Sequence, residues 1–400
     1  MADWLIACGV TTVAMESTGV YWTALYQVLE SKGLEVVLAN PQHLKRVPGR
    51  KSDVSDCQWL QQLHSYGLVA GSFRPEESVC VLRSYVRQRE RLVQSAAQHI
   101  QRMQKALDQM NLRLHRVVHD ITGKSGMAIL QAIVAGERDP DKLAALACSG
   151  VKSTQSQMVE ALRGNYRQEH LFVLGQELAL YEFLREQIKV CEAQIEAYLE
   201  ELTDKQPPSP PDPQPPTDKQ QKPPTKLRSK LLERLYRISG VNFAAIPGLG
   251  EKTVQVILSE VGFDPGRFEN SKQFCSWLGL APHRDISGGK VLKTRTRRTK
   301  NRAACSFRLA AQAAGRSKGA FGAHYRQLRA RLGAPKAITA MAHKIARLFY
   351  HLWQTGEAYE EMGVDAYEQQ QREHALDKLR KQAHRLGQEL VPKSELNPVS

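Results

Sequence analysis

Residues 10–40 have the sequence VTTVAMESTGVYWTALYQVLESKGLEVVLAN, and this stretch decides the fold class of the first part of the chain. VTTVAME (10–16) is rich in β-forming residues and ends on Glu16, and EVVLAN (35–40) has the same character. The segment between them has helical periodicity and ends on a glycine, as helices commonly do. A strand, a helix and a second strand of these lengths predict a parallel pair with a right-handed crossover. Sites in such sheets form at the carboxyl ends of strands, where Glu16 lies.

Two further carboxylates follow in DVSDCQWLQQLH (53–64), which continues as a helix after the loop PQHLKRVPGRKS (41–52). Asp53 and Asp56 are three residues apart, so their side chains share one face of that helix. Carboxylates held together repel one another unless a cation neutralises them, so this pair, with Glu16, predicts an Mg²⁺ site for phosphodiester chemistry. The alternative is that Asp53 only favours the N-terminus of the helix, as acidic residues often do.

Two long segments carry apolar residues in a seven-residue repeat, which predicts coiled-coil helices. The first, in residues 79–115, consists of Val86, Val93, Ile100, Leu107 and Leu114, with Ala96, Met103 and Met110. The second, from 174 to 202, consists of Leu174, Tyr181, Ile188, Ile195 and Leu202, with Leu184, Cys191 and Tyr198. A compact helical insert near residues 125–165 separates them. The two helices are expected to pair within one chain or between two copies.

The segment DKQPPSPPDPQPPTDKQQKPPTK (204–226) contains nine of the nineteen prolines and predicts an extended spacer between domains. The chain is therefore expected to be a multidomain protein of α/β and α parts. The expected parts are an α/β domain (1–75), a helical region (76–203), a proline-rich linker (204–226), a mostly helical C-terminal domain (227–356) and a polar tail (357–400).

The formal net charge of +15 is concentrated in one segment. Residues 281–350 contain seventeen Lys or Arg and a single acid, Asp285. A confined positive field attracts phosphate backbones and releases their counterions on binding, which predicts a nucleic-acid partner. Charge alone does not distinguish DNA from RNA, and the alternative is a solvated basic face.

Composition excludes several other classes of protein. No apolar run approaches the roughly 20 residues that a membrane span needs. The seven cysteines are scattered singly, without a CxxC pair, which argues against a disulfide framework and against a zinc site. The N-terminus lacks the basic and apolar segments of a secretory signal. A cytoplasmic location is expected.

The segment IPGLGEKT (246–253) is a candidate phosphate-binding turn. Gly248 and Gly250 expose backbone N–H groups just before a helix that carries Lys252 and Thr253, and such groups bind phosphates well. The pattern resembles a helix-hairpin-helix turn. The alternative is an ordinary connection between two helices.

Ser287 lies beside two glycines in HRDISGGK (283–290), where its hydroxyl can be exposed with little hindrance. Arg284 and Lys290 lie close by, and the following VLKTRTRRTKNR (291–302) is basic, so a phosphate and a developing negative charge could be held there. The candidate nucleic-acid contacts of this segment are Arg284, Lys290, Lys293, Arg295, Arg297, Arg298, Lys300 and Arg302. The alternative is a simple glycine-rich loop.

Together, four motifs resemble the IS one-ten / IS eleven-eleven insertion-sequence transposases, in that family's order over most of residues 5–355. They are VAMESTGVYW (13–22), VPGRKSDVSDCQWLQQLHSYGLVAGSF (47–73), IPGLGEKTVQVILSEVG (246–262) with RFENSKQFCSWLGLAP (267–282), and ISGGK (286–290). The resemblance implies a DEDD transposase with an RNase H/RuvC-like N-terminal domain, a coiled coil and a C-terminal transposase domain.

The resemblance also implies roles for particular residues and partners. Glu16, Asp53 and Asp56 match three of the family's four metal-binding acids, and Ser287 matches the serine that becomes covalently joined to DNA. The implied partners are the DNA of the element ends and target, a structured bridge RNA as guide, and further copies of the chain in dimers and tetramers.

One departure from the family concerns its first Asp, which lies in an initial strand far upstream of the glutamate. Only fifteen residues precede Glu16. Asp3 lies in MADWLIACG, which has the character of a helix, and it is not expected to replace that ligand. The domain is therefore expected to be partial and truncated at its N-terminus. The alternative functions are a remnant that only binds nucleic acid and a RuvC-like hydrolytic nuclease.

Overall fold

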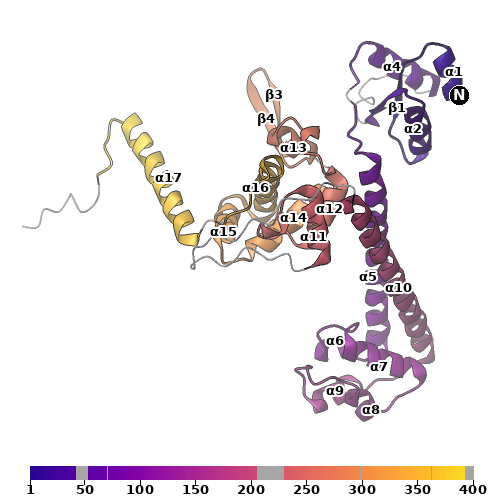
Figure 1. Cartoon of the computed structure of the whole chain (residues 1–400). Helices are drawn as coiled ribbons and strands as arrows, with labels where there is room; N and C mark the ends of the chain where they lie inside the picture. The colour runs from indigo at the N-terminus through magenta and orange to yellow at the C-terminus, as the bar shows by residue number, and fades with distance from the viewer. Residues whose placement is uncertain (42–52, 70, 205–228, 298, 362, 392–400) are drawn as a thin grey trace, which may run out of the picture. The chain divides into compact units, whose positions relative to one another are not determined.

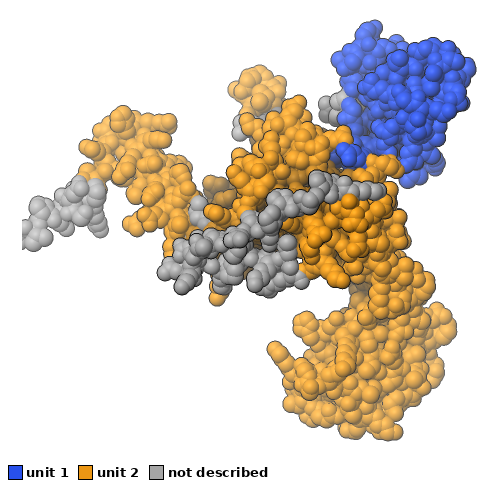
Figure 2. All heavy atoms as spheres, in the orientation of Figure 1, with its two compact units in different colours: residues 1–76 blue, residues 77–400 orange. Residues whose placement is uncertain are grey.

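The computed structural model describes residues 1–41, 53–69, 71–204, 229–297, 299–361 and 363–391. It divides into two compact units, residues 1–76 and residues 77–400 (Figure 2). Most of the expected loop (41–52), nearly all of the proline-rich linker and Arg298 lie outside the described residues, as do the side chains of Asp53 and of residues 283–285.

The first unit contains the parallel strand pair that the sequence predicts. Its elements are α1 (Ala2–Ala7), β1 (Thr12–Glu16), α2 (Tyr21–Ser31), β2 (Glu35–Ala39) and α4 (Asp53–Ser65). β1 and β2 are parallel, with Thr12 opposite Glu35 and Glu16 opposite Ala39. The helix α2 crosses between them and buries Leu29 against Leu34 and Leu38, because its apolar residues recur on one face.

Two long helices, α5 (Glu77–Gln109) and α10 (Gln168–Asp204), pack along each other (Figure 1). Near one end the hydroxyl of Tyr198 donates to the carbonyl of Ser78 at 3.0 Å. Farther along, His99 Nδ1 lies 2.5 Å from Glu177 Oε2. Residue numbers rise along one helix as they fall along the other, so the pair is antiparallel. Of the two expected arrangements, the structure shows pairing within one chain.

The apolar repeats form most of the contact between these helices. Met103 and Leu107 of α5 and Leu174 of α10 are fully buried, whereas Val93 is 40% exposed. The first repeat was expected to continue to Leu114, but α5 ends at Gln109 and the backbone turns at Asn111, whose φ is +59°. Asparagine tolerates this left-handed conformation better than most residues do, so it is a suitable helix terminator.

A small helical bundle connects the two long helices at one end (Figure 1). It consists of α6 (Leu114–Val117), α7 (Lys124–Ala135), α8 (Pro140–Ala145) and α9 (Gln155–Ala161). Thr154 and Gln157 form a capping box at the start of α9, and Asp139 caps α8. Leu130, Ile133 and Leu143 share one core with the ends of the long helices.

The remainder of the second unit is mostly helical. Its elements are α11 (Lys230–Ser239), η1 (Phe243–Ala245), α12 (Glu251–Val261), η2 (Pro265–Arg267), α13 (Ser271–Trp277), β3 (Pro282–Ser287), β4 (Lys290–Thr296), α14 (Arg302–Gly315), α15 (Ala320–Leu332), α16 (Ala334–Thr355) and α17 (Val364–Arg385). An aromatic core joins them: the rings of Phe243 and Phe349 stack with centroids 3.9 Å apart, and Phe274 and Phe307 are also fully buried. Aromatic side chains bury large areas, so a few of them stabilise a domain of short helices.

β3 and β4 form an antiparallel hairpin that projects from the helices around it (Figure 1). No strands were predicted at this position, where a simple glycine-rich loop was the alternative to a reactive serine. Gly288 and Gly289 form the turn with φ of +54° and +75°, and Ser287 lies opposite Lys290. A two-residue turn with two positive φ angles has the twist that matches paired strands, which is why two glycines here produce a hairpin.

The segment expected as a polar tail contains α17, a helix that is anchored at its beginning. Tyr367 is 4% exposed, and its hydroxyl lies 2.8 Å from His324 Nδ1 and donates to Gln327 at 3.1 Å. Across the described ranges, the structure has no helix with the length and apolar character to span a membrane.

Candidate functional site

The candidate carboxylates belong to the first unit and lie on neighbouring elements. Glu16 is the last residue of β1, and Asp53 is the first residue of α4, which packs against β1. Thr12 Oγ1 lies 2.8 Å from His64 Nε2, so the end of α4 lies beside the start of β1.

Glu16 and Asp56 differ in their surroundings. Glu16 is half-buried and its Oε1 accepts a hydrogen bond from the hydroxyl of Thr18, whereas Asp56 is exposed. Among the residues whose side chains the structure describes, no three acids, histidines or cysteines form a group that could hold a metal ion. The described side chains alone therefore do not make a metal site, and the side chain of Asp53 is not among them.

Asp3 has a different partner. It lies in α1, as the sequence analysis expected, and forms an ion pair with Lys32 at 2.8 Å. The hydrogen bond from Lys32 lowers the pKa of the Asp3 carboxyl. Asp3 therefore has an ion-pair partner within its own unit.

The turn IPGLGEKT packs closely against α14. Gly248 has φ of +91°, and a Cβ atom built on it would lie 2.2 Å from the carbonyl oxygen of Ala310. Only glycine satisfies both conditions, so this position has a packing role. Gly250, the N-cap residue of α12, is exposed and a Cβ there would meet nothing within 4 Å. The backbone at Gly250 is the accessible part of the turn, and Thr253 follows it as a partly buried residue.

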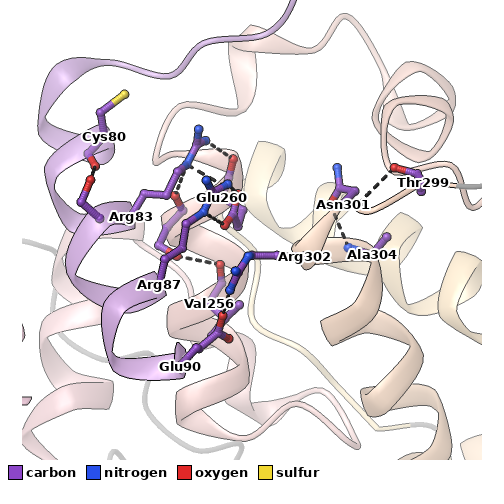
Figure 3. Close-up of polar contacts among 12 residues, drawn as sticks. Cys80, Arg83, Arg87, Glu90, Val256, Glu260, Thr299, Asn301, Arg302 and Ala304 are labelled. Carbon is purple, nitrogen blue, oxygen red and sulfur yellow. Dashed lines mark hydrogen bonds and ion pairs between the residues drawn. The ribbon is translucent and has the colours of Figure 1, made fainter. Parts of the chain in front are cut away.

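Lys252 and Arg302, two of the candidate nucleic-acid contacts, are paired with acids of the long helices. Lys252 Nζ lies 2.5 Å from Glu192 Oε1, and Arg89 binds the same carboxylate at 2.9 Å. Burial of Glu192 would raise its pKa, but the hydrogen bonds from Lys252 and Arg89 outweigh burial and lower it. Arg302, at the start of α14, pairs with Glu90 of α5 (Figure 3).

A buried ion pair that the sequence analysis missed lies beside these contacts. Glu260 of α12 is 6% exposed and accepts two hydrogen bonds from Arg87, each 2.7 Å long (Figure 3). Arg83 donates to the backbone carbonyls of Ser259 and Glu260 at 3.0 and 2.6 Å. The hydrogen bonds that Arg87 donates to the Glu260 carboxylate raise the pKa of Arg87. The one acid within the apolar run VQVILSEVG was the available signal, because a buried carboxylate requires a partner.

The described basic residues of the hairpin are exposed, in contrast to Lys252, Arg302 and Arg87, which are paired with acids. Ser287, the last residue of β3, is exposed, and five basic residues of this region are exposed with it: Lys290, Lys293, Arg295, Arg297 and Lys300. Two other candidates, Arg284 and Arg298, lie outside the described side chains. The structure therefore brings Ser287 together with the hairpin cations in one exposed element, while Glu16 and Asp56 belong to the other compact unit.

Two family models match this chain. Residues 1–112 match the model of DEDD transposases of the IS110 type, described as "Transposase", and this match includes Glu16, Asp53 and Asp56. Residues 241–326 match the model described as "Transposase IS116/IS110/IS902 family", and this match includes the hairpin. The search of curated proteins gave no match.

Proposed function

Because this chain belongs to the IS110 family of insertion-sequence transposases, we propose that it recombines DNA through a nucleophilic attack by Ser287. The observation that carries the proposal is the position of this serine. It ends β3 at the turn of an exposed hairpin, directly opposite Lys290. A hydroxyl in this position can reach a phosphate group without moving any buried element.

The proposed reaction is a transesterification. The Oγ of Ser287 loses its proton and bonds to phosphorus, while the bond from phosphorus to a deoxyribose oxygen breaks. The leaving oxygen takes up a proton, and the protein is joined to DNA by a new phosphodiester. The number of phosphodiester bonds does not change, so the step needs no high-energy cofactor.

The hairpin cations supply electrostatic stabilisation for this step. Lys293 and Arg295 are two residues apart on β4, so they lie on one face of the strand, and Arg297 directly follows its last residue. Exposed cations in such a row can contact successive phosphates and hold the strand while the serine reacts. They also stabilise negative charge on the phosphate oxygens during the attack.

The match to the DEDD family suggests a site that depends on a divalent metal. We propose Glu16, Asp53 and Asp56 as its Mg²⁺ ligands, since oxygen donors suit that ion and the family match includes all three. Bound Mg²⁺ would supply Lewis-acid activation of a phosphate. What supports this assignment is the position of Glu16 at the end of β1 and of Asp53 and Asp56 on α4, which packs against the same strand.

The proposed partners are DNA, a structured guide RNA and further copies of the chain. DNA follows from the transposase family and from the exposed cations, and the RNA from the resemblance of the sequence. The apolar repeats of α5 and α10 are used within one chain. A surface that remains for a second copy is the outer face of α10, where Phe172, Phe183 and Val190 are each more than 60% exposed.

The proposal is tested by searching for a covalent adduct between the protein and labelled DNA of the element ends, on denaturing gels, with Mg²⁺ and with EDTA. The parent protein should form an adduct only with Mg²⁺, and Ser287→Ala should form none. Thr294→Val, on the neighbouring strand of the same hairpin, is the matched control and should form as much as the parent.

Each other outcome identifies a different function. An equal adduct with Ser287→Ala would refute the nucleophile assignment. Cleaved DNA without attached protein would indicate a RuvC-like hydrolytic nuclease. Binding in gel shifts without any Mg²⁺-dependent product would indicate a protein that only binds nucleic acid.

A further inference from the structure

The end of the hairpin carries three aliphatic side chains that are exposed to solvent. Ile286 on β3 is 61% exposed, and Val291 and Leu292 on β4 are 52% and 64% exposed. Ile286 and Val291 are directly opposite each other in the strand register, and Leu292 lies at the irregularity that follows. The three side chains therefore gather next to the turn and immediately beside Ser287.

Elsewhere in the domain that carries the hairpin, Leu309 of α14 is also exposed, at 63%, but it stands alone. On α12 the aliphatic residues Val254, Ile257 and Leu258 are all but fully buried. Each large aliphatic side chain left in water forgoes the favourable free energy of its burial. Single exposed apolar residues are ordinary, but a contiguous group at the end of a projecting element indicates a binding surface.

The charges around this apolar group indicate what binds there. Lys290, Lys293, Arg295 and Arg297 are exposed on the same strand or at its edge. An apolar group bordered by cations is complementary to duplex DNA, whose phosphates flank a stack of apolar base faces. Proteins that bend DNA use this combination, with cations on the phosphates and aliphatic side chains inserted between base pairs.

We propose that Ile286, Val291 and Leu292 form an apolar wedge that enters the base stack of DNA at the phosphate attacked by Ser287. The inference rests on the proposed function for its DNA partner. Ile286 directly precedes Ser287, so a kink made by the wedge lies at the reacting step. Separating two stacked base pairs costs free energy, and burial of the aliphatic side chains with phosphate contacts offsets that cost.

The wedge accounts for how an exposed serine reaches its target. In regular duplex DNA the stacked bases keep the backbone in a uniform conformation. Unstacking one step bends the duplex and turns the phosphate at that step outward. The wedge therefore acts as a positioning element, and the hydroxyl of Ser287 performs the chemistry.

The experiment measures base unstacking by the fluorescence of 2-aminopurine placed at a TA step in a duplex, while fluorescence anisotropy of an end label measures binding. With the full-length chain at saturation, the fluorescence should rise severalfold. A triple variant, Ile286→Ser with Val291→Ser and Leu292→Ser, should lose most of this rise. Its salt dependence of binding should stay the same, because the cations remain.

Two further variants control for the possibility that the triple substitution disrupts the hairpin itself. Leu292→Ser changes a residue at the irregularity between the pairs formed by Val291 and Lys293, so strand pairing is kept, and it should lose a clear part of the rise. The matched control, Ile286→Val with Val291→Ile and Leu292→Met, keeps aliphatic side chains and should keep the rise.

The outcomes separate this inference from the proposed function. Ser287→Ala should unstack the bases as the parent does while forming no adduct, so loss of the adduct alone does not report on the wedge. A rise in the triple variant equal to that of the parent overturns the wedge, as does a parent that saturates the duplex without any rise. A triple variant that changes only the oligomeric state in sedimentation also overturns it, because the apolar group would then join copies of the chain.

Discussion

The cations around α12 and the cations of the β3–β4 hairpin have the same charge, but the first group is paired with acids and the second is exposed on a projecting element. Arg87 and Lys252 are held by carboxylates of the same chain, at 2.7 Å from Glu260 and 2.5 Å from Glu192. Lys293 and Arg295 are exposed on a projecting hairpin. A cation that already has a carboxylate partner gains less from a phosphate, because it must first give up that partner. The comparison therefore gives the first group an architectural role and supports the proposed nucleic-acid contact of the second.

The largest effect should come from removing the buried carboxylate that Arg83 and Arg87 share. Glu260→Ala leaves Arg87 without its bidentate partner, and breaking a buried pair in this way costs about 3 kcal/mol. Chemical unfolding followed by tryptophan fluorescence, where Trp353 and Trp277 report on this region, measures the loss. Glu269→Ala, an exposed acid of the same domain, is the control and should change stability little. Equal stabilities for the two variants would contradict the architectural role.

The second prediction compares the stability effects of substituting two glycines with positive φ, Gly248 beside α14 and Gly288 in the hairpin turn. Gly248→Ala combines a strained φ with a Cβ only 2.2 Å from the carbonyl oxygen of Ala310, whereas a Cβ on Gly288 meets nothing within 4 Å. Backbone strain alone costs about 1–2 kcal/mol at either position. Gly288→Ala should therefore lower the free energy of unfolding by about 1–2 kcal/mol, and Gly248→Ala by about 3 kcal/mol, because its clash adds to the strain. Equal losses of unfolding free energy in the two variants would show that α14 shifts away from position 248 without a free-energy cost. That result would contradict the packing role of Gly248.

The third prediction concerns the salt dependence of DNA binding. Replacing Lys293, Arg295 and Arg297 with Gln should lower the slope of log K against log salt by roughly 2–3, since each phosphate contact contributes about 0.9. The matched variant, Lys252→Gln with Arg302→Gln, should lower it by less than about 1, because these side chains already pair with acids. Anisotropy titrations at several salt concentrations measure both slopes. A larger decrease of the slope for Lys252→Gln with Arg302→Gln would contradict the proposal that the hairpin cations make the phosphate contacts.

The smallest expected effect concerns pH and the anchor of α17. Burial, with the nearby Lys344 and Arg331, lowers the pKa of His324 from 6.5 to about 4. Between these values the unfolded chain binds a proton that the folded chain does not, so stability falls as pH decreases from 6.5 toward 4. Hydrogen exchange of α17 as a function of pH should show this loss, and His324→Asn should flatten it. A profile that is unchanged in the variant would contradict the role of His324.

The elements that could be predicted from sequence are those specified by local pattern. Residues 10–40 form the expected parallel strand pair, and the helices α5 and α10 follow their apolar repeats. The hairpin was not predicted, although Gly288 and Gly289 between β-forming residues are a turn signal. The basic composition of HRDISGGKVLKTRT predicts a negatively charged partner. It does not indicate whether the segment forms a strand.

The sequence by itself determined the family, the strand that ends on Glu16, the two long helices and the segment that concentrates positive charge. Only the tertiary structure decided which cations are exposed, because an ion pair depends on proximity in space. Arg302 and Glu90 are 212 residues apart in the chain, and Arg87 and Glu260 are 173 apart, so no local spacing could reveal these pairs. The tertiary structure also decided that the long helices pair within one chain and that Ser287 ends a strand. In each case the physical reason is the same: these features depend on contacts between segments that are distant in sequence or on how the chain turns back on itself.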